Sequence, residues 1–338
     1  MPAQLKSIVF ANGDQTAGMV AELVATSLFS QFPLIRIPCG IADRLLTNDK
    51  CIIDISTAMK QYGAGVKIST GTDDVRILNA GLGSANIKLR EQMGVVGILR
   101  LIEQPKGYEK PCAIFRYGSG GFYEERTCEV VTENGIEYAV VTSRMNITNL
   151  AEFAKLAMQI ATKYELAIHV SSKWTIAPSE KIFADRITAV FDAAGFSYHK
   201  DLTDVALAKV ATDRTGGWLW LFDNPNGDSA ADVVDWTDGT RSMTSTLMCN
   251  GGIQYEEMPG GTAPDKFETD LLGPNFFNPI GIIGCFVRAI AAVNPDQQLY
   301  LQGMLHAAHT YIRVTPRSAW NTNEMIVAIP HYMSQNAA

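Results

Sequence analysis

The sequence lacks a long hydrophobic run, an excess of basic residues and any low-complexity tract. Its longest apolar stretch, near Pro279 to Val287, is too short for a transmembrane helix, which needs about 20 apolar residues. The 28 Lys and Arg residues against 35 Asp and Glu give a net charge of −7, which argues against a general nucleic-acid binder. With 47% hydrophobic and 19% charged residues, the 338-residue chain is expected to fold, in about two units of typical size.

Paired cysteine spacing is also missing. The six cysteines are scattered without a CxxC pair, so the spacing predicts neither a disulfide framework nor a zinc site, and we expect buried, inert thiols. The amino-terminal residues MPAQLKSIVFANGDQ contain only a four-residue apolar run and no secretory core region. We therefore expect a cytoplasmic protein without a membrane segment.

What the chain does contain is an alternation of short β-branched runs and amphipathic segments. The stripe of apolar residues from Leu150 to Ile160 predicts a helix, and Pro178 and Gly195 are typical first-turn and closing residues of the next. The alternation predicts an α/β architecture. The expected strands are 7–10, 66–70 and 167–172, and the expected helices are 16–29, 49–62 and 149–164.

One stretch interrupts this alternation. Residues 128–141 form two β-rich runs around Asn134-Gly135, which is the strongest short-range signal for a hairpin. A protruding hairpin leaves open strand edges that often pair with a second copy of the chain. We therefore expect a dimer.

The densest carboxylate cluster follows the apolar run Trp218 to Phe222. A strand that ends in a turn at Gly227, followed by a helix, would place Asp228 and Asp232 on one helical face. Two hard oxygen ligands in that arrangement suit Mg²⁺ or Mn²⁺. The alternative is a pair of ordinary acids that stabilise a helix start.

A second group of polar residues could bind an anion. Ser84, Asn86 and Arg90 are followed by Arg100 and Arg116, and arginine side chains bind carboxylates through two parallel hydrogen bonds. Such a set suits a small substrate with several negative charges. Separate surface arginines are the alternative.

Two further segments could take part in chemistry. Lys173 follows the expected strand 167–172, where a lysine could move protons, although a solvated lysine is the alternative. The turn Gly260-Gly261-Thr262-Ala-Pro-Asp265 could hold an adenosine ribose through its acid, or be a plain turn.

Taken in order, these segments resemble the isocitrate and isopropylmalate dehydrogenase family, the metal-dependent β-decarboxylating dehydrogenases, and isocitrate dehydrogenase most of all. The resemblance extends from Asn12 to about Asn323 and is strongest from Gly216 through Asn224-Pro-Asn-Gly-Asp228 to Met243-Thr-Ser-Thr-Leu. It implies an α/β fold with a large domain (1–94 and 239–338), a small domain (95–120 and 149–238) and a short clasp hairpin for dimerisation (121–148).

The resemblance also implies roles for individual residues. The metal would be held by Asp228 and Asp232, with Asp204 supplied by the neighbouring subunit. The proton-moving pair would be Tyr123 and Lys173, the lysine acting across the dimer interface. The substrate residues would be Thr72, Ser84, Asn86, Arg90, Arg100 and Arg116, and the cofactor residues Thr72, Gly260, Gly261, Thr262, Asp265 and Asn278.

The implied activity is oxidation of isocitrate, or of a close isocitrate-like 2-hydroxy acid, by hydride transfer to NAD(P) and loss of CO₂ with Mg²⁺ or Mn²⁺. We expect NAD, because Asp265 would repel a 2′-phosphate; NADP is the alternative. The family's cofactor loop starts His-Gly-Thr, but Gly260 replaces that histidine here. A phosphonate analogue of the 3-phosphonomethylmalate type, in phosphonate natural-product biosynthesis, is the alternative substrate, and a non-catalytic regulatory subunit is the alternative function. No nucleic-acid or membrane partner is expected.

Overall fold

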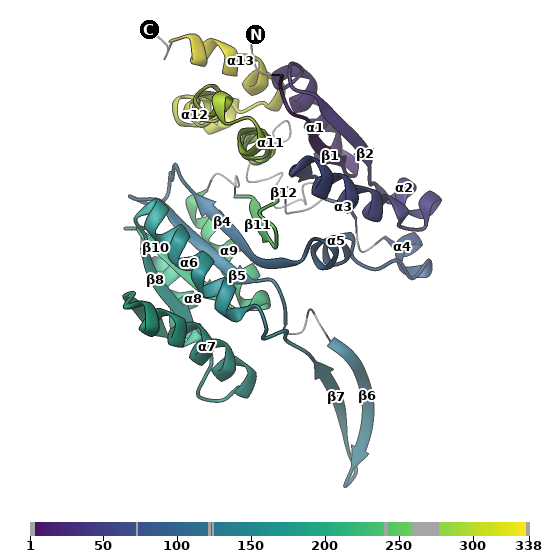
Figure 1. Ribbon diagram of the computed structural model, residues 1–338, viewed down its shortest axis with the longest axis vertical. Coiled ribbons are helices and arrows are strands. Elements are labelled where there is room, and N and C mark those ends of the chain that lie inside the picture. Colours follow the sequence, from purple (N-terminus) through teal and green to yellow (C-terminus); the bar gives the residue numbers. More distant parts are fainter. Residues whose placement is uncertain are drawn as a thin grey trace. The chain divides into compact units, whose positions relative to one another are not determined.

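The protein is described from a computed structural model, which covers residues 4–71, 74–120, 123, 125–239, 243–258 and 277–335 (Figure 1). The chain divides into two compact units. Unit 1 comprises Met1–Val95 and Thr240–Ala338, and unit 2 is the continuous segment Val96–Gly239. The assignment of these segments to a large domain, a small domain and a clasp stays a prediction.

The described elements of unit 1 are β1 (Ile8–Asn12), α1 (Gln15–Leu28), β2 (Leu34–Pro38), α2 (Ile41–Thr47), α3 (Lys50–Tyr62), β3 (Ala64–Lys67), α4 (Val75–Asn79), α5 (Ala85–Met93), β11 (Ser245–Cys249), β12 (Gln254–Glu257), α11 (Ile280–Val293), α12 (Gln298–Val314) and α13 (Thr322–Gln335), with 3₁₀ turns at Pro295–Gln297 and Arg317–Ala319.

The described elements of unit 2 are β4 (Val95–Ile102, starting at the boundary), β5 (Cys112–Tyr117), β6 (Glu125–Glu133), β7 (Ile136–Ser143), α6 (Leu150–Tyr164), β8 (Ala167–Ser171), α7 (Pro178–Ala194), β9 (Tyr198–Asp201), α8 (Thr203–Thr212), β10 (Trp218–Phe222) and α9 (Asn224–Asp238).

The strands of unit 1 lie in the order β2-β1-β3-β12-β11. β1 pairs in parallel with β2 and β3, β12 pairs in parallel with β3, and β11 is antiparallel to β12. The β12–β3 pairing joins Tyr255 to Gly65, so it links two segments that are far apart in the sequence. Strands that alternate with helices confirm the α/β class.

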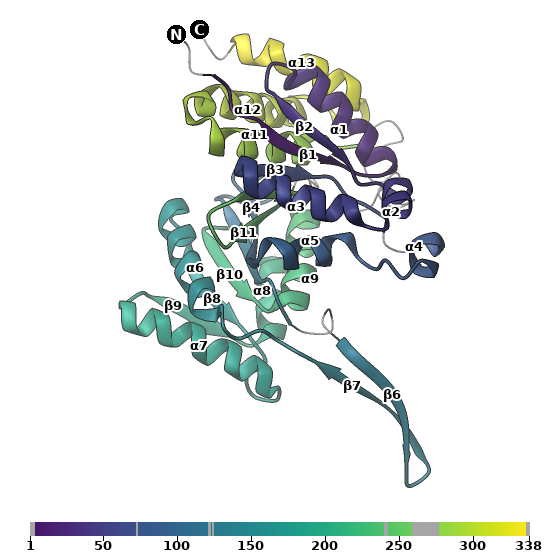
Figure 2. The same cartoon turned by 45° about the vertical axis from the view of Figure 1, so that its right-hand side comes forward.

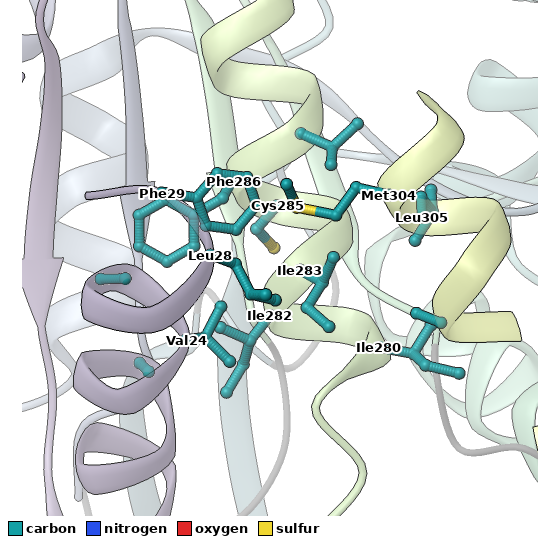
Figure 3. Packing of buried hydrophobic residues seen from close by; sticks show 14 of the residues in the cluster. Val24, Leu28, Phe29, Ile280, Ile282, Ile283, Cys285, Phe286, Met304 and Leu305 are labelled. Carbon is teal, nitrogen blue, oxygen red and sulfur yellow. The ribbon is translucent and has the colours of Figure 1, made fainter. Parts of the chain in front are cut away.

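The hydrophobic core of unit 1 lies among β1, β3, α1, α11 and α12 (Figure 3). Phe286 of α11 stacks on Phe29 and meets Phe10 edge-on, with ring centroids 5.1 Å apart in both pairs. Met304 and Leu305 of α12 complete the same cluster. Full burial of a side chain of this kind contributes about 1.5–3 kcal/mol, so this cluster is a main source of stability in unit 1.

The strands of unit 2 follow the order β4-β5-β10-β8-β9. β4 is antiparallel to β5, whereas β10 is parallel to both β5 and β8, and β9 is parallel to β8. Phe153 of α6 stacks on Phe115 with ring centroids 4.4 Å apart and so fixes that helix on the sheet. Because the carboxyl ends of parallel strands share one edge, residues that follow β5, β10 and β8 come close together, and such edges are common ligand sites.

The expected hairpin is confirmed. β6 and β7 pair as antiparallel strands around Asn134 (φ 51°) and Gly135 (φ 79°), whose positive φ angles are those of a type I′ turn. Every residue of β7 is exposed, and the hairpin projects from the helices of unit 2 in both views (Figures 1 and 2). The expectation of buried cysteines is wrong for Cys128, because this strand has no covering layer. Pairing of the hairpin with a second copy stays a prediction.

Candidate active site

The helix that carries the predicted metal carboxylates begins earlier than the sequence indicated. Asp223 directly follows buried strand β10, and its carboxylate caps α9 by accepting a hydrogen bond from the Asn226 N–H at 3.2 Å. Gly227 lies in the first turn of α9, so the expected glycine turn before the helix is wrong. A Cβ atom at Gly227 would come within 2.4 Å of the Arg116 Cβ, so close packing of α9 against β5 requires glycine there.

Asp228 and Asp232 lie one turn apart on α9 and share the guanidinium of Arg100. Arg100 Nη1 lies 2.7 Å from Asp232 Oδ1, and Arg100 Nη2 lies 3.2 Å from Asp228 Oδ1. Arg116 Nη1 approaches the same Asp228 oxygen at 2.9 Å. The four side chains therefore form one cluster.

Sheet register explains why both arginines reach these carboxylates. Ile98 of β4 lies opposite Arg116 of β5, and Arg100 lies opposite Ile114. The arginines are therefore diagonal neighbours on the same face of the antiparallel pair. The face that carries them is covered by α9, which packs on β5.

Exposure differs sharply within this cluster. The side chains of Arg100 and Arg116 are 6% and 2% exposed, whereas those of Asp228 and Asp232 are 29% and 64% exposed. The cationic side is therefore built into the protein, and the carboxylate side is accessible to solvent. Asp232 is therefore the most solvent-accessible member of the cluster.

Tyr123 joins the cluster from the segment before β6. Its hydroxyl donates a hydrogen bond to Asp228 Oδ2 at 2.8 Å. Burial, together with the negative charge of Asp228, raises the pKa of Tyr123 to about 12. At neutral pH the phenol therefore keeps its proton and can act as a proton donor.

Lys173 and Asp204 pair with each other in this chain. Lys173 Nζ lies 2.6 Å from Asp204 Oδ1, and the hydrogen bond from the lysine lowers the pKa of that carboxyl group. The backbone N–H of Lys173 also donates to Glu180 Oε2 at 3.0 Å. Within the described residues no group of three His, Cys, Asp or Glu side chains converges as a metal site, so one chain brings together Asp228 and Asp232 without Asp204.

The predicted substrate residues of unit 1 lie on helix α5 and at its start. Ser84 caps α5, since its hydroxyl accepts a hydrogen bond from the Ile87 N–H at 3.4 Å. Asn86 Oδ1 is buried and has no hydrogen-bond partner among the described residues. Arg90 binds the fully buried carboxylate of Glu257, with Nη2 3.0 Å from Oε1.

Most of the predicted cofactor residues lie outside the described residues. These are Thr72, Gly260, Gly261, Thr262 and Asp265. Asn278 is described: it is 5% exposed, and its Oδ1 accepts a hydrogen bond from the Ile280 N–H at the start of α11. Its position at a buried helix start is compatible with a structural role as well as with cofactor binding.

Two acidic residues beside these groups were missed by the sequence analysis. Glu257 stands next to Glu256 in β12, whose other two residues are uncharged. Two adjacent acidic residues in a buried strand are the sequence feature that could have indicated Glu257. Asp223 lies in the carboxylate-rich segment after Phe222, and nothing in its local sequence predicts a separate role for it. Burial, with the nearby charge of Glu180, raises the pKa of Asp223 to about 7.

Comparison with known proteins places the chain in a family of enzymes. The family model described as isocitrate/isopropylmalate dehydrogenase matches residues 24–298, so the chain belongs to this family and the predicted resemblance is confirmed.

Among individual relatives, the chain is 25% identical to "Isocitrate dehydrogenase [NADP] 1" of Mycobacterium tuberculosis, over 84% of this chain and 81% of the relative. It is 27% identical to the mitochondrial isocitrate dehydrogenase [NADP] of Candida tropicalis, over 84% and 77% of the two chains.

A solved structure shares the fold. It is the isocitrate dehydrogenase of Ostreococcus tauri in complex with isocitrate and magnesium(II), which matches with a TM-score of 0.80 and 21% identity over 97% of this chain and 100% of that chain. The predicted fold class is therefore confirmed. In the part of the chain that is described, no helix combines the length and apolarity needed to cross a bilayer.

Proposed function

We propose that the protein catalyses metal-dependent oxidative decarboxylation of isocitrate, or of a close isocitrate-like 2-hydroxy acid, with NAD(P) as hydride acceptor. The observation that supports this most is the convergence on Asp228 of two buried arginines and a protonated tyrosine. Such a cluster offers oxygen ligands for a metal, cations for substrate carboxylates and a proton donor in one place.

The donor set fits a hard divalent metal. Asp228 and Asp232 present carboxylate oxygens one helical turn apart, and both side chains are open to solvent. Mg²⁺ and Mn²⁺ take such ligands and retain other positions for water or substrate. When bound, the metal would supply Lewis-acid stabilisation of negative charge on substrate oxygens. We propose that Asp204 of a second subunit completes the set.

The remaining residues would orient the substrate and move its protons. Arg100 and Arg116 would bind substrate carboxylates, and their burial fixes the geometry of both guanidinium groups. Tyr123 would donate its proton to the substrate carbon that loses CO₂. Lys173 of the second subunit would take the proton of the substrate hydroxyl.

The α5 residues would distinguish substrates. Ser84 and the unpartnered Asn86 Oδ1 offer polar contacts that a branched apolar substituent would leave unsatisfied. This favours an anionic, polar substituent such as the carboxylate of isocitrate. A phosphonate in the same position would satisfy the same groups.

For the nicotinamide we propose NAD, on the expectation that Asp265 repels a 2′-phosphate. The relatives named above carry NADP in their names, so a clear preference for NADP would overturn this part of the proposal alone.

The test measures reduction of NAD and NADP by the purified protein with Mg²⁺ and isocitrate, with EDTA as the control and a phosphonomethylmalate analogue as the second substrate. We expect EDTA-sensitive turnover of isocitrate. Turnover of the analogue alone would establish the phosphonate alternative. No turnover of either substrate would contradict the proposal and favour a regulatory subunit.

Asp228→Asn tests the site itself. We expect a loss of turnover of at least about a thousandfold, because the metal loses a charged ligand where transition-state charge develops. Asp185→Asn is the matched control, since Asp185 is a half-exposed carboxylate on α7 that pairs with Lys181 and Lys200. Full activity of Asp228→Asn would overturn the assignment.

Mixed dimers test whether the site is shared between subunits. Asp228→Asn and Lys173→Ala homodimers should both be inactive. Co-expressed mixed dimers should regain activity, because one of their two sites would combine an intact Asp228 with an intact Lys173. Absence of recovery in a purified mixed dimer would show that each chain supplies its own lysine.

A further inference from the structure

Two cysteines of unit 1 lie side by side although they are not paired in the sequence. Cys39 directly follows β2, and Cys51 lies in the first turn of α3. Their Sγ atoms are 4.0 Å apart, and the residues are 1% and 4% exposed. Helix α2 spans the interval between them.

The surroundings of this pair favour a thiolate on Cys51. The hydrogen bond with the Cys39 thiol lowers the pKa of Cys51 to about 6, and Thr47 and the charge of Arg44 act in the same direction, while burial and Asp49 oppose it. The hydrogen bond with Cys51 and burial raise the pKa of Cys39, although the charge of Lys67 opposes this shift. The surroundings therefore favour ionisation of Cys51 over ionisation of Cys39, and a thiolate is the nucleophilic form of cysteine.

The pair is linked to helix α5 through a short ionic network. Asp49 stands two residues before Cys51, and its carboxylate binds Arg44 Nε at 2.8 Å and Lys88 Nζ of α5 at 2.6 Å. Arg44 Nη2 also donates to the carbonyl oxygen of Gly83 at 2.8 Å, directly before α5 begins. Through these contacts, a displacement at the start of α3 would be transmitted to α5.

We propose that Cys39 and Cys51 are a redox-active thiol pair, and that their oxidation to an intramolecular disulfide loosens the helix that carries Ser84, Asn86 and Arg90. The chemistry needs an oxidant of the peroxide class. The Cys51 thiolate attacks one oxygen of hydrogen peroxide and breaks the O–O bond, so that Cys51 becomes a sulfenic acid. The other oxygen leaves as hydroxide and takes a proton from solvent to become water. The Cys39 sulfur then attacks the Cys51 sulfur, and a second water leaves with the hydroxyl and the Cys39 proton.

Closing the bond has a geometric consequence. The Sγ atoms must approach from 4.0 Å to about 2.05 Å, and the proposal takes the start of α3 to shift toward β2 as they do. Asp49 moves with it, and its contacts with Arg44 and Lys88 lengthen. Amide hydrogens of α5 should then exchange faster. The faster exchange in α5 does not depend on the proposed function. A rise in KM for the substrate after oxidation would follow only if the proposed function is correct.

The experiment starts from the Cys128→Ser protein, which lacks the exposed thiol of the hairpin. The folded protein is treated with hydrogen peroxide, remaining thiols are alkylated, and tryptic peptides are analysed without reduction. We expect peptide 37–44 joined to peptide 51–60. Hydrogen–deuterium exchange of α5 amides should be about threefold faster after oxidation and return to its original rate after treatment with dithiothreitol.

Two variants sharpen the test. Cys39→Ser should abolish both the joined peptide and the change in exchange. Cys112→Ser, which removes a fully buried thiol in unit 2, should change neither. Failure to find the joined peptide in folded protein, or its formation without faster exchange in α5, would overturn the proposal.

Discussion

Each unit contains a cluster of arginines and carboxylates, and the two clusters differ in exposure. In unit 1 the charged groups form buried ion pairs. Glu257 is fully buried and pairs with Arg90, and Arg44 is fully buried and pairs with Asp49. In unit 2 the arginines are equally buried, but Asp232 is 64% exposed. The same residue types therefore form buried ion pairs in one unit and a solvent-accessible cluster in the other, where we propose that a ligand binds.

The physical reason lies in what satisfies each charge. A buried ion is costly unless its partners are complete, so a closed pair resists the loss of either member. An exposed carboxylate is partly stabilised by water and can exchange that water for a metal or substrate. The comparison predicts that mutations in the buried ion pairs of unit 1 reduce stability and that mutations in the exposed carboxylates of unit 2 reduce binding.

The largest effect on stability should follow Arg44→Met. Among the described residues, this change leaves the buried Asp49 with Lys88 as its cationic partner and removes a donor to the Gly83 carbonyl. We expect the free energy of unfolding to fall by about 3–5 kcal/mol. Urea denaturation measures this free energy. A loss below about 1 kcal/mol would contradict the view that the Arg44–Asp49 pair behaves as a buried ion pair.

Addition of a metal ion tests the solvent-accessible cluster of Asp228 and Asp232 in unit 2. At a Mn²⁺ concentration of about one hundred times Kd, the folded state should gain about 2.7 kcal/mol, seen as a rise in melting temperature of about 4 °C. Asp228→Asn should lose this rise, and Asp185→Asn should retain it. An equal rise in all three proteins would place the metal elsewhere.

A smaller effect concerns Asp223, the buried acid at the start of α9. Its folded-state pKa of about 7 exceeds the ordinary value of 3.8, so the folded protein holds a proton that the unfolded chain releases. The stability from this group is complete below about pH 4 and is lost as pH rises toward 7. Asp223→Asn keeps the cap and should flatten this dependence, which we expect to span about 1–3 kcal/mol in denaturation between pH 4 and 8. An unchanged profile in the variant would rule out Asp223 as its source.

The smallest effect should follow Lys50→Met, on the surface of unit 1. Lys50 and Asp54 are 3.6 Å apart with side chains 73% and 49% exposed. Solvent screens such a pair, so the free energy of unfolding should change by less than about 0.5 kcal/mol. A loss comparable with that of Arg44→Met would mean that burial does not explain the contrast.

Features coded by neighbouring residues could be predicted from the sequence. Pro178 and Gly195 bound α7, and Asn134-Gly135 makes the hairpin turn, because these residues restrict or permit the backbone conformation locally. The predicted start of α9 after Gly227 is wrong. Glycine is needed at this position because a Cβ atom there would collide with Arg116 of β5, not because the chain turns there. That requirement is invisible before the sheet order is known.

In the candidate site, too, the features that depend on neighbouring residues could be predicted, and the contacts that depend on the sheet order could not. The spacing of Asp228 and Asp232 placed them on one helical face, as the structure shows. Their contact with Arg100 depends on the pairing of β4 with β5, and the binding of Arg90 by Glu257 joins residues far apart in the sequence. The Cys39–Cys51 contact likewise had no sequence motif, because a helix lies between the two residues.

The interruption of unit 1 by unit 2 has a consequence for synthesis. β12 lies between β3 and β11 in the sheet of unit 1, yet the ribosome makes it only after all of unit 2. The continuous segment 96–239 can thus complete its own sheet while the chain is still growing, whereas the first 95 residues must wait with the β12-facing edge of β3 unpaired. During translation, the part that begins first is the part that finishes last.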